Sequence, residues 1–479
     1  MVLSELAMRA YNASPTPCRS AMASTRGFYL RLWRYGHDTE RLVEEALERE
    51  TWSEARWRSW QQERLAFVLN RAATRVPFYR GHWSERRCKG DRASWEYLEN
   101  WPVLEKENVR RHPRAFVAED CSPRRMFSEH TSGTTGKPLQ LWWSAATVRY
   151  WYALMEARWR RWHGVSRHDR WAILGGQLVT PVKQRTAPFW VWNAALRQLY
   201  MSSYHLAPAS IPAYLNALVR YRVSYLWGYS SALSTLAHGA IRLGRRDLKL
   251  QVVITNAEPL VEPQRIAISE AFQCPVRETY GMCEITTAAG ECEAGTMHLW
   301  PEVGIVELSA APTTAVGPAR ELICTGLVNA DMPLVRYRLG DRGGPIRWKQ
   351  TICECGRSLP ELCSIDGRMD DVLYSRDGRV IGRLDPVFKS SLPVEEAQII
   401  QDNLDRVRVL CVPAPGFSNA TAREIASRLR DRMGPIEVVI EQVRSIPRSA
   451  NGKLRSVISN VRPEEHALAA SEQLCVSEF

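Results

Sequence analysis

Residues 131–138 place small hydroxyl side chains, two glycines and one lysine in eight consecutive positions. Glycine lets a backbone approach a ligand closely, and converging N–H groups and hydroxyls bind anionic oxygens. The stretch is not a Walker loop, because Gly133 and Gly136 are too close together and Pro138 stands where that loop has a hydroxyl. We therefore predict a loop that holds the phosphates of ATP, with Lys137 adding positive charge. The alternative is an ordinary hairpin or linker.

Four later stretches carry further polar groups suited to nucleotide chemistry: residues 280–284, 336–341, 367–371 and 447–455. Together with the first loop, they resemble in order and spacing the motifs of the AMP-forming adenylate ligases. This superfamily includes acyl-CoA synthetases, firefly luciferase and the adenylation domains of peptide synthetases. Lys137 and Lys453 occupy the two expected lysine positions and are two of only eight lysines in the chain, which argues against a chance match.

Within that superfamily the chain resembles the phenylacetate-CoA ligase branch, especially the ligase-like proteins associated with capsular polysaccharide genes. The resemblance covers residues 65–459, and the stretches that carry it are residues 76–80, 104–106, 227–231 and 353–357. It implies a ligase in which Mg-ATP activates an aryl or acyl carboxylic acid to an acyl-adenylate, pyrophosphate leaves, and CoA accepts the acyl group. The alternative acceptor is an amine of a sugar or amino acid, giving an amide in polysaccharide biosynthesis. An alternative of another class is a non-catalytic scaffold with the same fold.

The resemblance implies catalytic roles for Glu284, Arg368 and Lys453. Glu284 would bind Mg²⁺, which prefers hard oxygen ligands, although Met282 and Cys283 replace the small hydroxyl that usually precedes it. Lys453 would stabilise the charge that develops during adenylation. Two alternatives stay open at this point: Glu284 could cap the start of a helix, and residues 451–453 could be an ordinary surface turn.

The resemblance also implies the remaining contacts of the nucleotide. Asp341 would accept hydrogen bonds from the ribose hydroxyls, Arg368 would bridge ribose and phosphate, and Tyr280 would stack near the adenine. Asp370 would be the hinge about which a small lobe turns. The residues implied to bind ATP are Thr131, Ser132, Gly133, Thr134, Thr135, Gly136, Lys137, Glu258, Tyr280, Gly281, Asp341 and Arg368.

The pocket for the acid is implied by the same comparison of motifs. Its aromatic members would form a mostly apolar cleft, but ordinary packing explains each of these aromatic side chains equally well. The implied lining residues are Tyr204, His205, Trp227, Gly228, Tyr229 and Ala257, with Glu258 adjacent.

A second cluster of chemically active residues follows Glu284. Cys292 and His298 lie six positions apart, and Cys353 and Cys355 form a Cys-x-Cys turn. Three thiolates and one imidazole are the ligands of a closed tetrahedral zinc site. We therefore predict a candidate structural zinc site, with simple burial of the cysteines as the alternative.

The apolar pattern predicts an α/β protein that can position these motifs. Short apolar runs at residues 171–174 and 252–255 are separated by helical segments such as residues 211–221, which is typical of parallel strands with crossover helices. Residues 304–308 and 321–325 are instead typical of antiparallel strands, and they predict a β-barrel-like part.

We predict three domains from these patterns. Residues 1–64 form a helical extension, and residues 65–367 form a large adenylate-forming domain with mixed and parallel sheets and crossover helices. Residues 368–479 form a small mobile α+β lobe, which contains a hairpin around Asp377 and Gly378 and a helix over residues 422–432.

The N-terminal extension shows helical apolar spacing over residues 38–70, and Pro77 ends that series. Before it, the apolar residues between 28 and 35 alternate with Arg26, Arg31 and Arg34. Such a mixture suits peripheral contact with a membrane surface. Packing against the body of the protein is the preferred interpretation.

Composition narrows the function classes. The 479 residues are 45% hydrophobic, enough for two or three cores. The net charge of +12, from 64 basic and 52 acidic residues, suits anionic ligands such as ATP and CoA, but it is spread along the chain, so we do not predict nucleic-acid binding. The chain lacks the roughly 20 apolar residues of a membrane helix and a signal-peptide pattern. We therefore predict a cytoplasmic protein whose twelve cysteines stay reduced.

Overall fold

The computed structural model describes most of the chain. The described residues are 5–131, 139–181, 183–257, 260, 262–309, 320–348, 352–363, 365, 373–376, 379–381, 384–388, 392–444, 446 and 457–461.

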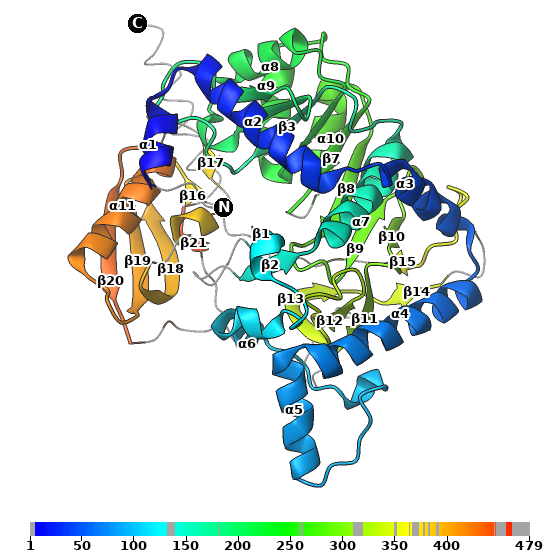
Figure 1. Ribbon diagram of the computed structural model, residues 1–479. Coiled ribbons are helices and arrows are strands. Elements are labelled where there is room, and N and C mark those ends of the chain that lie inside the picture. Colours follow the sequence, from blue (N-terminus) through cyan, green and yellow to red (C-terminus); the bar gives the residue numbers. More distant parts are fainter. Residues whose placement is uncertain are drawn as a thin grey trace, which may run out of the picture.

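A ten-stranded mixed sheet forms the centre of the large domain (Figure 1), in the order β14-β15-β10-β9-β8-β7-β6-β3-β5-β4. Neighbouring strands from β5 through β3, β6 and β7 to β8 are parallel, and the outer strands pair antiparallel. The predicted strands at 171–174 and 252–255 are confirmed. In chain order the strands are β3 (Trp171–Gly175), β4 (Trp190–Asn193), β5 (Gln198–Ser202), β6 (Tyr225–Gly228), β7 (Val252–Thr255), β8 (Val276–Gly281), β9 (Ala288–Glu291), β10 (Met297–Leu299), β14 (Ile346–Arg347) and β15 (Glu361–Leu362).

Helices cover both faces of the parallel strands. Successive side chains of a strand point to opposite faces, so one strand contributes to the core on each side. On β6, Leu226 packs into the cluster that contains α8, α9 and α10, whereas Tyr225 and Trp227 pack into the cluster that contains α7. The two faces are therefore both buried, as in other parallel sheets. These helices are α7 (Ala145–Met155), followed by a π-turn at Glu156–Arg160, α8 (Ile211–Arg220), α9 (Ser230–Arg242) and α10 (Glu262–Phe272).

The N-terminal helices wrap the large domain. The predicted series over residues 38–70 is two helices, because the 3₁₀ turn Arg49–Thr51 separates them, and Pro77 begins a further helix at its first position, where proline costs no hydrogen bond. The helices are α1 (Glu5–Ala13), α2 (Thr16–Arg34), α3 (Thr39–Glu48), α4 (Glu54–Arg75) and α5 (Pro77–Cys88).

Helix α2 packs against the body of the protein, as preferred from the sequence. The hydroxyl of Ser20 accepts from the amide of Trp192 (3.2 Å) and the hydroxyl of Ser24 accepts from the amide of Ala194 (3.0 Å), so the helix binds the edge strand β4. Phe28, Tyr29 and Leu32 of the same helix are exposed, and contact with a membrane surface stays a prediction. None of the helices among the described residues is long and apolar enough to span a membrane.

The second part of the large domain contains two small antiparallel sheets. The strands predicted at 304–308 and 321–325 are β11 and β12, and β12 also pairs with β13 in a three-stranded sheet. Two strands, β1 and β2, flank residues 132–138. The bounds are β1 (Phe127–His130), β2 (Gln140–Trp143), β11 (Gly304–Leu308), β12 (Arg320–Gly326), β13 (Tyr337–Gly343) and α6 (Lys106–Arg111).

The C-terminal lobe is a separate α+β unit, on the left of Figure 1, with the sheet order β20-β19-β18-β21 and one long helix, α11. The strands β16 and β17, on either side of the predicted hairpin turn, pair antiparallel, whereas residues 377 and 378 lie outside the described part of the chain. The predicted helix 422–432 lies within α11. The bounds are β16 (Leu373–Tyr374), β17 (Val380–Ile381), β18 (Val394–Asn403), β19 (Arg406–Pro413), α11 (Asn419–Met433), β20 (Glu437–Gln442) and β21 (Val457–Ser459). The predicted α/β fold with a smaller α+β lobe is confirmed.

Candidate active site at the carboxyl edge of the parallel strands

The predicted site residues follow the carboxyl ends of neighbouring parallel strands. Tyr229 comes directly after β6, Ala257 comes after β7, and Tyr280 lies at the end of β8. The strand pairing brings Gly228 opposite Thr255, so these ends lie at one edge of the sheet. Open α/β sheets bind ligands outside this edge. The topology therefore gathers motifs that are far apart in the sequence.

Two of the predicted nucleotide contacts meet directly. The hydroxyl of Tyr280 donates a hydrogen bond to Oδ2 of Asp341 on β13, with a distance of 2.9 Å. The two residues lie 61 positions apart, and they come from the ten-stranded sheet and the three-stranded sheet respectively. This bond fixes the orientation of a carboxylate that is predicted to face a ribose.

Glu284 lies in the turn between β8 and β9 and is buried, with 8% of its surface exposed. Its Oε1 atom is 3.3 Å from Nζ of Lys106 and accepts a hydrogen bond of 3.2 Å from the hydroxyl of Tyr337. No helix begins here, because residues 282–287 lead into β9. The alternative interpretation of Glu284 as a helix cap is therefore wrong.

Lys106 and Tyr337 were not predicted as site residues. Lys106 begins α6, and the segment before α6 is attached to β13 by two backbone hydrogen bonds of Leu104, one from its amide to Arg336 (2.9 Å) and one from Arg338 to its carbonyl (3.0 Å). Lys106 and Glu284 are 178 positions apart. Residues 104–106 carried part of the family resemblance, but the sequence did not indicate that Lys106 contacts Glu284. That contact depends on where α6 lies in the fold.

The residues around Glu284 fit a magnesium ion. A buried carboxylate supplies one hard oxygen ligand, and Mg²⁺ commonly takes one or two carboxylates together with water and substrate phosphates. In the structure the ammonium of Lys106 compensates the charge of this carboxylate. A buried anion needs such a partner. Lys106 would compensate the charge of Glu284 when no metal ion is bound, and the metal ion would compensate it when one is.

Thr131 closes the base of the predicted phosphate loop. Its amide donates to the carbonyl of Leu139 (3.1 Å), and its Oγ1 accepts from the amide of Leu139 (2.9 Å), directly beyond the pairing of His130 with Gln140. The hydroxyl is thus bound to the backbone in this structure, and its contact with phosphate stays a prediction. The predicted residues that lie outside the described part of the chain are Ser132, Gly133, Thr134, Thr135, Gly136, Lys137, Glu258, Arg368, Asp370 and Lys453.

The side chain of Asn256 was also missed from the sequence. Asn256 follows β7 directly, and its backbone N–H donates to the carbonyl of Gly228 (3.0 Å). Its Oδ1 atom is buried and has no hydrogen-bond partner among the described residues. A buried acceptor without a partner costs about 1–3 kcal/mol, which a ligand that donates a hydrogen bond at this edge would recover.

The predicted acid pocket is only partly brought together. The hydroxyl of Tyr204 donates to the carbonyl of Gly176 (2.7 Å), and the hydroxyl of Tyr229 accepts from the amide of Gly176 (3.3 Å), so both tyrosines meet just beyond β3. Trp227 instead packs edge to face on Trp159, with centroids 5.7 Å apart, inside the other core cluster. Ala257 is exposed and has a φ of 65°. The pocket assignments stay predictions.

His205 is held by hydrogen bonds on both ring nitrogens. Nε2 lies 3.0 Å from the carbonyl of Pro181 and must donate to it, so Nδ1, 2.9 Å from Ser202 Oγ, is the acceptor. The ring also stacks on Phe189. Burial lowers the pKa of His205 from 6.5 to about 4, so the imidazole is neutral at pH 7.

This depressed pKa predicts a loss of stability in acid. Between pH 6.5 and 4 the unfolded chain binds a proton at His205 that the folded chain excludes, so unfolding becomes easier as the pH falls, by up to about 1.4 kcal/mol per pH unit. In His205→Gln this titrating group is absent. The difference in unfolding free energy between wild type and variant should therefore become smaller as the pH falls from 6.5 to 4. Urea unfolding across this range measures it. An exposed control, His37→Gln, should keep the acid sensitivity of the wild type; a constant difference for His205→Gln would contradict the prediction.

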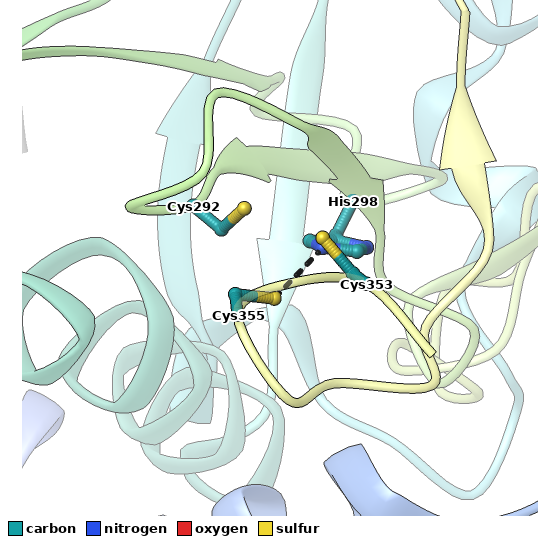
Figure 2. Close-up of side chains that lie close together, drawn as sticks. All are labelled: Cys292, His298, Cys353 and Cys355. Carbon is teal, nitrogen blue, oxygen red and sulfur yellow. Dashed lines mark hydrogen bonds between the residues drawn. The ribbon is translucent and has the colours of Figure 1, made fainter. Parts of the chain in front are cut away.

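The four residues of the predicted zinc site are brought together. One donor atom from each of Cys292, His298, Cys353 and Cys355 lies within 4.8 Å of all the others. Figure 2 shows these side chains gathered between the β9–β10 hairpin and the turn that precedes β15.

Comparisons with known proteins find two families and several relatives that resemble this chain. Residues 58–314 match the sequence profile of the family described as AMP-binding enzyme, and residues 373–460 match that of the CapK C-terminal domain. Protein CapK of Staphylococcus aureus is 24% identical over 94% of this chain and 99% of its own length. The phenylacetate-coenzyme A ligase of Thermus thermophilus is 26% identical over 86% of this chain and 98% of its own length.

A solved structure has the same fold. The 2-hydroxyisobutyryl-CoA ligase in complex with 2-HIB-AMP and CoA, in the thioesterification state, gives a TM-score of 0.53 at 20% identity and covers 89% of this chain and 94% of that chain. At this identity the likeness establishes the fold alone.

Proposed function

This chain belongs to the AMP-binding enzyme family, and on that premise we propose that it is an AMP-forming carboxylate ligase. The family assignment confirms the resemblance predicted from the sequence. In the proposed first step, a carboxylate oxygen of the acid attacks the α-phosphorus of ATP, the bond to the β-phosphate oxygen breaks, and pyrophosphate leaves. In the second step, the thiolate of CoA attacks the acyl carbon, and AMP leaves.

The observation that carries this proposal is the convergence of Tyr280, Glu284 and Asp341. Tyr280 and Glu284 share one motif and Asp341 belongs to another, yet Tyr280 binds Asp341 at 2.9 Å, and Glu284 accepts a hydrogen bond from Tyr337, which lies on the same strand as Asp341. One carboxylate for the ribose and a second carboxylate for a metal ion suit a bound nucleoside triphosphate. Mg²⁺ bound at Glu284 would neutralise phosphate charge during the attack.

The proposed roles of the other groups follow from the charge that must be managed. Two anions have to approach each other, so cations must surround the α-phosphate. Lys453 and Arg368 are the proposed cations, by their match to the family motifs. Lys137, with the hydroxyls of its loop, would hold the β- and γ-phosphates, and Asp370 would be the hinge that lets the lobe deliver Lys453.

CoA is the proposed acceptor, because two phenylacetate-coenzyme A ligases, of Thermus thermophilus and Pseudomonas putida, are 26% identical to this chain. The net charge of +12 also suits a polyanionic cosubstrate. An amine acceptor is the second candidate, and the observation that favours it is the match of residues 373–460 to the CapK C-terminal domain. The name of protein CapK does not state an acceptor, so the reaction product must distinguish CoA from an amine.

Exchange of labelled pyrophosphate into ATP tests the first step. The exchange should require an acid, and a panel of aryl, fatty and hydroxy acids should identify the class that supports it. Product mass then identifies the acceptor: a thioester with CoA supports the main proposal, and an amide with an amino sugar or amino acid supports the second. If no acid in the panel stimulates exchange while ATP still binds, the scaffold alternative replaces both.

A further inference from the structure

We propose that Cys292, His298, Cys353 and Cys355 bind one structural zinc ion, separate from the nucleotide site. Their donor atoms all lie within 4.8 Å of one another. In a tetrahedral zinc site with metal–sulfur bonds of about 2.3 Å, the sulfur atoms are about 3.8 Å apart. The four donors therefore already lie close to the spacing that one ion requires, and Figure 2 shows them around a common centre.

The imidazole of His298 is oriented for metal binding. Its Nδ1 lies 3.1 Å from the carbonyl of Leu359, and because a carbonyl can only accept, Nδ1 carries the proton. The neutral ring then presents the lone pair of Nε2, which lies 3.3 Å from Sγ of Cys355. A second hydrogen bond of this kind is how proteins fix the tautomer of a metal-binding histidine.

Two glycine turns position the cysteines. Gly295 donates to the carbonyl of Cys292 (3.0 Å), and Gly356 donates to the carbonyl of Cys353 (2.8 Å). Both glycines have positive φ, 78° and 80°, which other residues rarely adopt. Each glycine therefore closes a tight turn that begins at a cysteine, at Cys292 directly after β9 and at Cys353 before β15.

The donor set selects zinc over the magnesium proposed at Glu284. Three sulfurs and one imidazole nitrogen are soft or borderline ligands, whereas magnesium prefers oxygen. The set supplies four protein ligands and no carboxylate, which is typical of a closed structural site rather than a catalytic one. Cys292 and His298 are buried, and no disulfide joins the cysteines.

The site connects three distant segments of the chain. Arg357, just after the Cys-x-Cys turn, donates from Nε to Glu50 (2.9 Å), and Glu50 also accepts from Trp162 Nε1 (2.7 Å). The amide of Ser358 donates to the carbonyl of Glu50 (2.8 Å). A zinc ion that holds the turn on the β9–β10 hairpin would therefore also hold the N-terminal helices on the large domain.

Metal analysis of the full chain, purified without a histidine tag, tests the proposal. We expect about one zinc per chain in the wild type and less than about 0.2 in Cys292→Ser and Cys355→Ser, since a structural site loses its ion when a ligand is lost. Cys363→Ser is the matched control, because Cys363 is exposed and close in sequence to the turn but is not a donor. It should keep the zinc content of the wild type.

A second measurement does not depend on the variants folding. Removing the ion from wild-type protein with a chelator should lower the unfolding temperature and increase amide hydrogen exchange in residues 353–362 and around Glu50, and added Zn²⁺ should reverse both changes. Less than about 0.2 zinc per wild-type chain, or a disulfide between two of the four cysteines in protein purified under reducing conditions, would overturn the proposal. Neither outcome depends on ligase activity.

Discussion

Replacing Lys453 by alanine is expected to lower the rate of adenylate formation by about 10²- to 10³-fold, the usual loss when one preorganised group that stabilises transition-state charge is removed. The reason is that negative charge increases on the α-phosphate as the acid attacks, and the proposed ammonium interacts with it most strongly at that moment. Pyrophosphate exchange measures this step directly.

Lys249→Ala is the control for this experiment, because Lys249 is an exposed lysine in the large domain. It should exchange pyrophosphate at the wild-type rate. Transfer to CoA from preformed acyl-adenylate should be affected much less by Lys453→Ala than adenylation is. Equal loss in both steps would mean that the lysine supports the fold of the lobe and not the chemistry.

Replacing Glu284 by glutamine should raise the magnesium concentration needed for half-maximal exchange by about 10-fold or more and lower the maximal rate. The substitution keeps the size of the side chain but removes its charge, so the metal loses a ligand. The same change leaves Lys106 without its carboxylate partner, because their 3.3 Å ion pair is lost. Titration of exchange with Mg²⁺ gives both quantities.

The contribution of Lys106 can be separated from that of the metal. Lys106→Met removes the ammonium that competes with the metal ion for Glu284. If the metal ion then compensates the charge of Glu284, the magnesium concentration needed for half-maximal exchange should fall or stay unchanged, whereas Glu284→Gln should raise it. Glu270→Gln, at an exposed position of α10, controls for a general effect of lost charge. A Glu284→Gln enzyme with an unaltered magnesium titration would remove this carboxylate from the metal site.

The sequence by itself determined the local features of the protein, because they depend on neighbouring residues. The apolar run Val252–Thr255 is a strand, the amphipathic segment Ile211–Arg220 is a helix, and the turn that contains Cys353 and Cys355 was recognisable from its spacing. The motifs also predicted the chemistry, since a phosphate loop or a metal ligand set is defined by residue types over a few positions.

Only the tertiary structure decided which of these groups meet. The packing of the three-stranded sheet and of α6 against the ten-stranded sheet brings Tyr280 to Asp341 across 61 positions and Lys106 to Glu284 across 178, and no local pattern encodes either pairing. It also placed Trp227 against Trp159 in a buried cluster, although its sequence position is equally compatible with a pocket. An aromatic side chain buries the same apolar area in a core or beside a ligand, so the sequence pattern is identical and the packing of the sheet makes the distinction.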